Sequence, residues 1–494
     1  MSFQLGLSCV ICGHSRANER LRGPCANCGG SVAVDYDYES IQDAVSREKF
    51  GTQPLGVWKY KELLPISNRS NVISLGEGGT FLHRARRIAE KIGLRKLFIK
   101  DETTNPTGSF IDRGVTIEVS KARELGFRTT VCGTTGNLGA SLAAYSAKGD
   151  FKCKIFLPKR IDVGKFYQII TYGAEVEPAR NFEEALSKAA ELGNRSYLAS
   201  PDDPFFLEGL KTTGYEICEQ MDWKNPRNII APMGDGGHLS MIWRGINELL
   251  KIGILDRANV RMIGVQAQGA SPIVKAFQGM ALPVKPLETS KTLAADIDMR
   301  RPFHGNLAIQ TIVQSKGLAM TVSDSEILHS ASLLAKTEGI FVEPASASTI
   351  ACLFKLVEHG EIHRDEETVC VLTGAGLKDP LSVRRMIQGR KRVQNLFERI
   401  GEHTVATGIT GTKLHILQVL NETESYGYGL WKKLKELFEI HLSLPSMYQH
   451  LNELEMMKLI ERTRIGREAG KRERCYYALT EKGKAILRGS VSIR

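Results

Sequence analysis

Short apolar runs alternate with helix-periodic segments along most of the chain. Between these runs, three segments have the three-to-four-residue apolar spacing of helices and end at glycine, namely GVTIEVSKARELG, GASLAAYSAKG and FEEALSKAAELG. Alternating strands and helices predict an α/β fold with parallel sheets, in which ligands bind beyond the carboxyl ends of the strands. The predicted buried strands, most of which lead into glycine-containing loops, are FIKDE, TTVCGTTGN, KCKIFLP, AEVEPA, NIIAPMGDGG, VRMIGVQAQG and TVCVLTGAG.

The pattern changes after a Gly- and Thr-rich linker at residues 399–411. Apolar spacing predicts three helices, and two strands follow them with basic residues between the strands. A basic β-hairpin after three helices is typical of a winged helix. We predict three parts along the chain: a cysteine-containing segment at residues 1–35, the α/β body at 36–400 and the winged helix at 401–494. The expected winged-helix elements are helices at 412–420, 427–438 and 444–458 and strands at 459–465 and 475–480.

Composition fits a multidomain globular protein. The 494 residues are 42% hydrophobic and 24% charged, and this length exceeds what one core usually supports. No run of eighteen apolar residues occurs and the start lacks the pattern of a signal peptide, so we expect a cytoplasmic protein without membrane contact. The net charge is +11, and residues 404–494 carry 15 Lys and Arg against 10 Asp and Glu. This basic tail favours an anionic partner.

Four cysteines near the start form two close pairs. Cys9 and Cys12 are separated by two residues, as are Cys25 and Cys28, and glycines adjoin both pairs. Four soft thiolates from two tight turns suit tetrahedral zinc, and a closed all-cysteine shell makes the site structural. The alternative is a knuckle that has lost its metal or formed disulfides, which an intracellular setting disfavours.

Eight loop motifs occur in register along residues 9–394: GVWKYKELLP, SLGEGGTFL, KDETTNPTGSFIDRG, GTTGNLGASLAAYSA, LEGLKTTGYEI, APMGDGGHLSMIWRG, EGIFVEPASAS and VLTGAGLKDP. Together they resemble archaeal-type threonine synthase, a fold-type II enzyme dependent on pyridoxal phosphate. The resemblance includes the cysteine knuckle. It implies a body of two subdomains, each built on a parallel or mixed sheet.

The resemblance also implies where a ligand binds. The loop from Gly234 to His238 corresponds to the one that holds the cofactor phosphate, although Asp235 stands where the family usually has Asn and would repel a phosphate. A plain glycine-rich turn is the alternative. Asn137 corresponds to the contact of the pyridoxal phenolic oxygen, and Thr373 to that of the pyridine nitrogen. The full set of expected ligand-binding residues is Ser109, Thr134, Thr135, Gly136, Asn137, Gly234, Asp235, Gly236, Gly237, His238 and Thr373.

Ile111 occupies the position of the lysine that binds the cofactor covalently in this family. An isoleucine has no nucleophilic nitrogen, so we expect no catalytic residue here and, at most, non-covalent binding of pyridoxal phosphate. A displaced lysine such as Lys100, Lys165 or Lys211 would lose the orientation that makes the step fast. The charged stretch at residues 292–301, with Asp296, replaces a less charged family segment; it predicts either a remodelled pocket mouth or a solvated loop.

The C-terminal segment resembles PadR-type winged-helix regulators through YGYGL, LPSMYQHLNELEMMKLIER and YYALTEKG. In such a domain the third helix reads base edges and the wing neutralises phosphates of double-stranded DNA. Use of the winged helix for protein contacts is the alternative. Little sequence follows Leu487, so a homodimer would form through the body. The expected DNA-binding residues are Ser446, Tyr448, Gln449, His450, Asn452, Arg462, Arg464, Arg467, Lys471, Arg472 and Arg474.

These features together predict a transcription regulator that responds to a small molecule of threonine or related amino-acid metabolism. Two other hypotheses stay open. The chain could be an active pyridoxal-phosphate-dependent threonine synthase-type lyase with a DNA-binding appendage. It could also be an architectural DNA binder whose body only dimerises.

Overall fold

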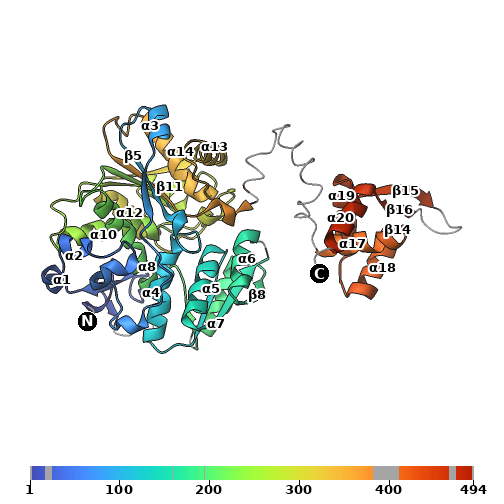
Figure 1. Cartoon of the computed structure of the whole chain (residues 1–494), viewed down its shortest axis with the longest axis horizontal. Helices are drawn as coiled ribbons and strands as arrows, with labels where there is room; N and C mark the ends of the chain where they lie inside the picture. Colours follow the sequence, from blue (N-terminus) through green and yellow to red (C-terminus); the bar gives the residue numbers. More distant parts are fainter. Residues whose placement is uncertain are drawn as a thin grey trace. The chain divides into compact units, whose positions relative to one another are not determined.

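The computed structural model describes residues 3–16, 25–159, 161–193, 195–380, 382, 411–466 and 474–491. The chain divides into two compact units, Met1–Met386 and Ile387–Arg494, which are described separately (Figure 1). The boundaries that the sequence predicts at residues 35 and 400 stay predictions. Within the described part of the chain, no helix is long and apolar enough to span a bilayer.

The first unit is built around a six-stranded sheet in the order β12-β11-β10-β13-β5-β4, parallel except at β4. Fully buried side chains on both faces explain why its central strands are almost uniformly apolar. The strands are β4 (Phe81–Arg84), β5 (Leu97–Asp101), β10 (Asn228–Pro232), β11 (Arg261–Ala267), β12 (Leu318–Val322) and β13 (Thr368–Leu372). The accompanying helices are α3 (Arg86–Ile92), α8 (Pro204–Leu210), α9 (Thr212–Gln220), α10 (Gly237–Lys251), α11 (Pro272–Gln278), α12 (Gly305–Gln314), α13 (Asp324–Thr337) and α14 (Pro344–Glu358).

A second, four-stranded parallel sheet has the order β8-β7-β6-β9. It forms the smaller subdomain, whose helices α5, α6 and α7 are coloured in greens in Figure 1. The strands are β6 (Thr129–Gly133), β7 (Lys152–Pro158), β8 (Glu175–Ala179) and β9 (Tyr197–Leu198), and the helices are α4 (Ile111–Glu124), α5 (Asn137–Gly149), α6 (Val163–Thr171) and α7 (Phe182–Leu192). The seven strands and three helices that the hydrophobic pattern predicts are all present, and the expected α/β class with parallel sheets is confirmed.

The N-terminal residues form a small antiparallel sheet in the order β2-β1-β3, followed by two short helices. Leu7 of β1 and Val34 of β3 are buried in the same hydrophobic cluster as residues of β10 and α10. The knuckle is therefore packed into the body's core rather than attached as a separate module. The elements are β1 (Gln4–Cys9), β2 (Ser15–Arg16), β3 (Val32–Tyr36), α1 (Tyr38–Ala44) and α2 (Arg47–Gly51).

A buried ion network fixes α4 between the two subdomains. The Arg113 guanidinium, fully buried, donates to Glu102 at 2.6 Å and to Glu216 of α9 at 2.8 Å. Lys100, also fully buried, donates to the same Glu216 at 2.7 Å. Because removing one partner from such a network leaves an uncompensated buried charge, these contacts hold the start of α4 in one position.

The second unit is a three-helix fold followed by a β-hairpin, as predicted. Strand β16 pairs with β15 and also with a short strand β14 that the sequence pattern did not indicate. Leu487 of the last helix packs into this unit's own core. The elements are α17 (Gly411–Glu422), β14 (Ser425–Tyr426), α18 (Gly427–Phe438), α19 (Leu444–Met456), β15 (Ile460–Gly466), β16 (Arg474–Leu479) and α20 (Glu481–Val491).

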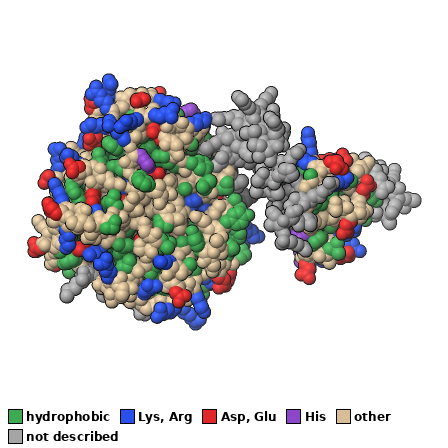
Figure 2. Space-filling view, viewed as in Figure 1, with side chains coloured by type: hydrophobic (Ala, Val, Ile, Leu, Met, Phe, Trp, Pro, Cys, Tyr) green, Lys and Arg blue, Asp and Glu red, His purple; other side chains and the backbone are tan. Residues whose placement is uncertain are grey.

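The face of the body shown in Figure 2 mixes apolar and charged side chains. Lys and Arg side chains gather there near α3, at the top of the view. Between α3 and β5, Arg95 pairs with Asp365 at 2.7 Å and Lys96 pairs with Glu367 at 2.9 Å. We assign this surface no role.

Candidate functional site

The loops after β5, β6, β10 and β13 converge at the carboxyl ends of their strands. The segment before α4 joins the loop after β13: the Phe110 N–H donates to the Thr373 carbonyl at 3.0 Å, and Ser109 forms a β-bridge with Gly374. Most of the ligand-binding residues that the sequence predicts come from these loops. The structure therefore brings together segments that are separated by up to about 260 residues in sequence.

The glycine loop between β10 and α10 is closely packed. Gly236 has a φ of 93°, and a Cβ there would meet the Ala308 side chain and the His304 backbone, so only glycine fits. The Asp235 carboxylate accepts the Gly237 N–H at 3.1 Å, while the Asp235 carbonyl accepts the His304 N–H at 3.0 Å. The negatively charged Asp235 carboxylate therefore uses an N–H donor at the N-terminus of α10 that a bound anion would otherwise use.

His238 turns away from the glycine loop into the core. Its ring stacks on Phe110 with centroids 4.2 Å apart, and its Nε2 lies 3.1 Å from the Thr213 hydroxyl. Burial lowers the pKa of His238 to about 3, so the ring is neutral at ordinary pH. Its side chain therefore packs the base of the site, and the backbone of His238 is the part that belongs to the loop.

The loop before α5 presents backbone N–H groups at a helix start. Thr134 is buried and its hydroxyl accepts the Gly136 N–H at 3.0 Å, whereas Thr135 is exposed. Gly136 has a φ of 147°, and a Cβ there would collide with the Lys165 side chain. This close approach places Lys165 of α6 directly against the start of α5.

Lys165 is the centre of a buried charge cluster. Its Nζ, on a residue only 1% exposed, lies 2.8 Å from Asp296, 2.9 Å from Glu343 and 3.3 Å from Asp162. The Asn137 amide donates to both of the first two carboxylates, at 3.0 Å to Asp296 and 3.1 Å to Glu343. The cluster thus joins α5 and α6 of the smaller subdomain to Asp296 and Glu343 of the larger one.

The pKa values of the two central carboxyl groups, Glu343 and Asp296, are shifted in opposite directions. Burial and the neighbouring Asp296 raise the pKa of Glu343 to about 8. Burial opposes ionisation of Asp296 as well, but Lys165 outweighs it and holds the pKa of Asp296 below its ordinary value. At neutral pH the pair therefore shares one proton, held on Glu343.

The sequence allows two interpretations of residues 292–301, a remodelled pocket mouth or a solvated loop. In the structure, part of the segment faces the site and part lies on the surface. Asp296 of η4 (Ala295–Ile297) faces the cluster, whereas Arg300 pairs with Glu183 on the surface. Glu343 was missed as a site residue, although the EGIFVEPASAS motif contains it. Nothing in the local pattern could reveal that a residue 178 positions beyond Lys165 contacts it.

Ile111 is the first residue of α4, and its side chain packs with Phe110 against the apolar core of the smaller subdomain. Three lysines that could supply an amine in place of Ile111 are engaged elsewhere. Lys100 lies in the Arg113 network, and Lys211 pairs with Glu208 and Glu248 at 2.5 Å and 2.9 Å. Lys378 donates to the Thr107 carbonyl at 2.7 Å and to Gln168 at 2.6 Å.

Thr373 closes the site on the side of β13. Its hydroxyl is 3.1 Å from that of Ser346, which also accepts the N–H groups of Thr373 and Gly374 at 2.9 and 2.8 Å. A Cβ at Gly374 would overlap the Glu343 carboxylate. Glycine at this position is therefore what admits Glu343 to the cluster.

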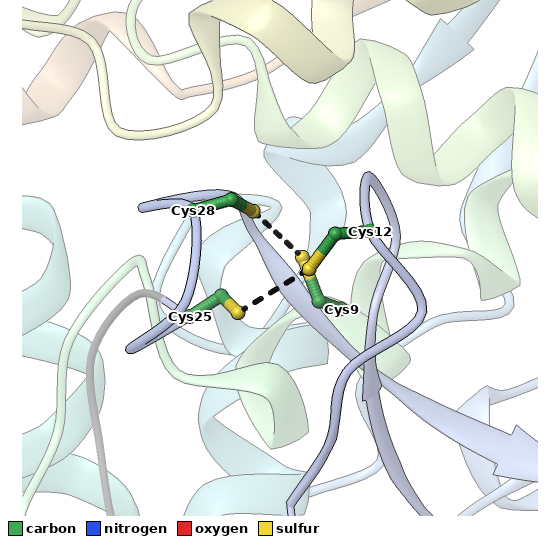
Figure 3. Close-up of side chains that lie close together, drawn as sticks. All are labelled: Cys9, Cys12, Cys25 and Cys28. Atoms are coloured by element: carbon green, nitrogen blue, oxygen red, sulfur yellow. Dashed lines mark hydrogen bonds between the residues drawn. The ribbon is translucent and has the colours of Figure 1, made fainter.

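The four N-terminal cysteines converge as the spacing predicts (Figure 3). Their sulfurs all lie within 4.8 Å of one another, with 3.4 Å between Cys9 and Cys28 and 3.8 Å between Cys12 and Cys25. Tetrahedral zinc with Zn–S bonds of about 2.3 Å places sulfurs about 3.8 Å apart, so the cluster could bind zinc without rearrangement. The backbone N–H groups of Ile11 and Asn27 donate to Cys9 and Cys25 at 3.4 Å, as suits thiolates.

In the second unit, α19 carries five of the side chains that the sequence predicts to contact DNA, and three of them are exposed. Met447, Leu451 and Leu454 are buried, which leaves Tyr448, Gln449 and Asn452 exposed and Ser446 and His450 half-buried. Among the basic candidates, Arg462 is exposed and donates to Glu455 at 2.9 Å. In the hairpin, Arg464 of β15 pairs with Tyr476 and Arg474 of β16 pairs with Gly466. Arg467, Lys471 and Arg472 lie outside the described residues.

Comparison with known proteins identifies two families. Residues 73–374 match the model of the pyridoxal-phosphate dependent enzymes, and residues 416–489 match the transcriptional regulator PadR-like family. Threonine synthase of Methanocaldococcus jannaschii is 44% identical over 376 residues, which is 75% of this chain and 92% of the relative. Threonine synthase of Methanosarcina acetivorans is 42% identical over 381 residues, which is 76% of this chain and 93% of the relative.

Solved structures agree on the fold. An L-serine ammonia-lyase from the fungus Rhizomucor miehei matches with a TM-score of 0.56 and 19% identity over 63% of this chain and 98% of that one. Threonine deaminase isoform 2 of Solanum lycopersicum matches with a TM-score of 0.55 and 21% identity, over 68% of this chain and 90% of that one. The predicted fold-type II architecture is confirmed. The chain belongs to the family of pyridoxal-phosphate dependent enzymes, with a threonine synthase-like body fused to a PadR-like unit.

Proposed function

We propose that this protein is a transcription regulator whose threonine synthase-like body senses a small molecule of amino-acid metabolism and whose winged helix binds double-stranded DNA. The observation that carries the proposal is Ile111. It begins α4 at the position where the family motif NPTGSFKDRG has its lysine, while Asn137 and Thr373 of the same site are retained. A hydrocarbon there can neither bond to the cofactor nor move a proton.

The residues of this site do not fit a covalently held pyridoxal phosphate. Ile111 supplies no amine, and Lys100, Lys211 and Lys378 are held by the contacts described above. Lys165 lies against the start of α5, but Asp296 and Glu343 keep its ammonium charged and raise its pKa well above the ordinary value despite burial. A charged ammonium is not a nucleophile, so binding of pyridoxal phosphate would be non-covalent.

Side-chain contacts link the ligand loops to the last described residues of the body. Lys378 of η5 (Gly376–Lys378) joins the segment before α4 to α6 through Thr107 and Gln168, and Asp379 accepts the Ser382 N–H at 3.0 Å. Residue 382 is the last one described before the linker. A ligand that repositions α6 would therefore also shift residues 378–382, and we propose that the coupling to DNA binding equals the ligand's preference for one arrangement over the other.

The DNA-binding half of the proposal is supported by the exposed polar face of α19 and by the basic hairpin. Tyr448, Gln449 and Asn452 are suited to groove contacts, and the residues from Arg462 to Arg474 include six basic and two acidic side chains that would neutralise phosphates. We further propose a homodimer formed through the body and a structural zinc ion in the knuckle. Such a dimer would recognise a pseudo-palindromic site.

One experiment separates this proposal from an active lyase. The purified full chain is incubated with pyridoxal phosphate, treated with borohydride and analysed by peptide mass spectrometry, in parallel with an assay of phosphate release from O-phosphohomoserine. We expect no pyridoxyl-lysine and no phosphate release. Ile111→Lys tests whether the pocket regains covalent binding, and Ile111→Leu serves as the matched control.

The active lyase is the second candidate, favoured by the high identity to threonine synthases. A pyridoxyl adduct on any lysine of the unmodified chain together with phosphate release would establish it and refute the sensor. DNA binding is measured by fluorescence anisotropy on duplexes selected from a random pool, with and without amino acids. DNA affinity that no metabolite changes would favour the purely architectural role.

A further inference from the structure

His304 lies between the cysteine knuckle and the glycine loop. Its side chain is buried, with Nδ1 2.8 Å from the Ser31 hydroxyl and Nε2 3.0 Å from the Pro201 carbonyl oxygen. A carbonyl oxygen can only accept, so the Nε2–H donates to Pro201. In the neutral ring Nδ1 is then an acceptor, and the Ser31 hydroxyl donates to it. The two hydrogen bonds therefore hold the ring in one orientation.

The glycine loop packs directly against His304. The His304 N–H donates to the Asp235 carbonyl at 3.0 Å. A Cβ at Gly236 would lie 2.9 Å from the His304 carbonyl oxygen, and one at Gly237 would lie 3.0 Å from the ring carbon Cδ2. Both distances are shorter than ordinary contacts of about 3.5–4.0 Å, so the loop backbone touches the backbone and the ring of His304. A shift of His304 would therefore move the loop.

The two cysteine turns, residues 9–14 and 25–31, hold Ser31 in place. Ser31 is the last residue of the second turn, and its carbonyl accepts the Val10 N–H of the first turn at 3.0 Å. The position of Ser31 thus depends on how the two turns are held together. A zinc ion would join them through four Zn–S bonds, whereas four thiolates without a cation would repel one another.

One hydrogen bond connects these turns with the two subdomains. Within the described residues, that bond is the contact of Ser31 with His304. The strands behind the turns are anchored independently, because Arg244 of α10 donates to the Val34 carbonyl of β3. A cavity beside Ser31 has the cysteine turns on one side and α10 and α12 on the other. Because this space is not filled by side chains, the turns have room to shift while the strands stay in place.

We infer that the metal occupancy of the knuckle sets the conformation of the glycine loop through Ser31 and His304. With zinc bound, the turns fix Ser31, and Ser31 keeps His304 against residues 235–237. Loss of zinc releases Ser31, and the loop then adopts other conformations. The inference rests on the proposed structural zinc ion. It goes beyond the proposed function, because it makes the state of the knuckle a second input to the ligand site.

The test measures hydrogen–deuterium exchange of the full chain by mass spectrometry, with zinc bound and after treatment with a zinc chelator. The reporters are the amides of Gly237 and His304, which donate to the carboxylate and the carbonyl of Asp235. The amides of β6, in the other sheet, report any global loosening. Chelation should speed exchange of the reporters about tenfold more than that of β6, because a local opening exposes only the amides that it frees.

Ser31→Ala separates the hydrogen bond from the metal. It removes the hydroxyl and keeps all four cysteines, so the zinc content should stay unchanged while the reporters exchange about tenfold faster. Chelation should then add little, since both changes break the same link. Ser31→Thr retains a hydroxyl and should preserve the exchange rates of the unmodified chain. The matched control is Ser8→Ala, which removes a 2.8 Å bond to Asp35 within the same small sheet and should alter neither quantity.

Reporters that respond to neither chelation nor Ser31→Ala would overturn the inference and leave the sensor proposal standing. A response of β6 equal to that of the reporters would overturn it as well, and so would an effect of chelation that Ser31→Ala does not reproduce. If the purified chain binds no zinc, the structural zinc proposal fails together with the inference. If chelation unfolds the chain, the comparison of Ser31→Ala with Ser31→Thr on the zinc-bound protein decides.

Discussion

Replacing Asp235 by asparagine should increase the affinity of the glycine loop for phosphate. In the unmodified chain the Asp235 carboxylate accepts the Gly237 N–H at 3.1 Å, which is a donor that a phosphate oxygen would otherwise use. Asparagine keeps the size of the side chain and removes its charge. The loop geometry should survive the change, because the close packing of Gly236 against Ala308 and His304 does not involve the Asp235 side chain.

The size of the effect follows from the distance. A phosphate oxygen that accepts from the same N–H would lie roughly 4 Å from the carboxylate, where two unit charges repel by about 1 kcal/mol in water and about 4 kcal/mol at an effective dielectric constant of 20. Asp235 is half-buried, so the repulsion lies between these limits for each phosphate charge. A dianion at even the lower limit experiences about 2 kcal/mol. We therefore expect a gain of at least about tenfold in affinity.

Calorimetry with pyridoxal phosphate and with pyridoxal, which lacks the phosphate, measures this gain. Asp235→Asn should tighten the binding of pyridoxal phosphate and leave that of pyridoxal unchanged, and added salt should reduce the difference between variant and unmodified chain. An equal gain for both compounds would mean that the substitution acts through the loop's conformation. No gain for either would refute the assignment of Asp235 as an electrostatic block.

Three further predictions concern the knuckle, the core and the winged helix. Cys25→Ser should lower the zinc content, measured by mass spectrometry, and the melting temperature, because structural zinc sites contribute folding free energy. The control Cys153→Ser should not lower them in this way. Unchanged values for Cys25→Ser would exclude a metal-bound knuckle. Despite burial, Lys211 and Arg244 lower the pKa of Glu248 to about 2. Its stabilisation is therefore complete above pH 4.5 and lost as the pH falls toward 2, so Glu248→Gln should flatten the acid limb of denaturant unfolding; an unchanged limb would contradict this. Tyr448→Ala should weaken DNA binding in anisotropy assays and change the melting temperature little, since the residue is 46% exposed; unchanged DNA binding would remove α19 from the interface.

Local patterns of apolar and polar residues predict most of the helices and strands. The strand at Thr368–Leu372 is entirely buried and, apart from Thr368, apolar, and helix α18 begins and ends at the predicted residues 427 and 438. The short strand β14 escaped prediction because two residues, Ser425 and Tyr426, have no period to read. Its existence depends on pairing with β16, some fifty residues away, and such pairing leaves no trace in a local window.

The candidate site was predictable where a motif states its own chemistry. The paired cysteines and the glycine loop are such cases, because their spacing is itself the signal. The Lys165 cluster is different: its members come from the smaller subdomain, η4 and the start of α14, and their separation in sequence conceals their contact. Asp235 stands out in the sequence because the family usually has Asn there, but only the structure reveals the N–H that it accepts.

The second unit encloses its own hydrophobic cluster, in which Leu417, Leu434, Leu451, Tyr477 and Leu487 are all buried. A segment with a closed interior should remain folded when expressed without the preceding 410 residues. The short polypeptide 411–494 would then serve as a reagent for genome-wide footprinting. The genes under control could thus be mapped first, and the pathway that they encode would indicate the metabolite, reversing the usual order of discovery.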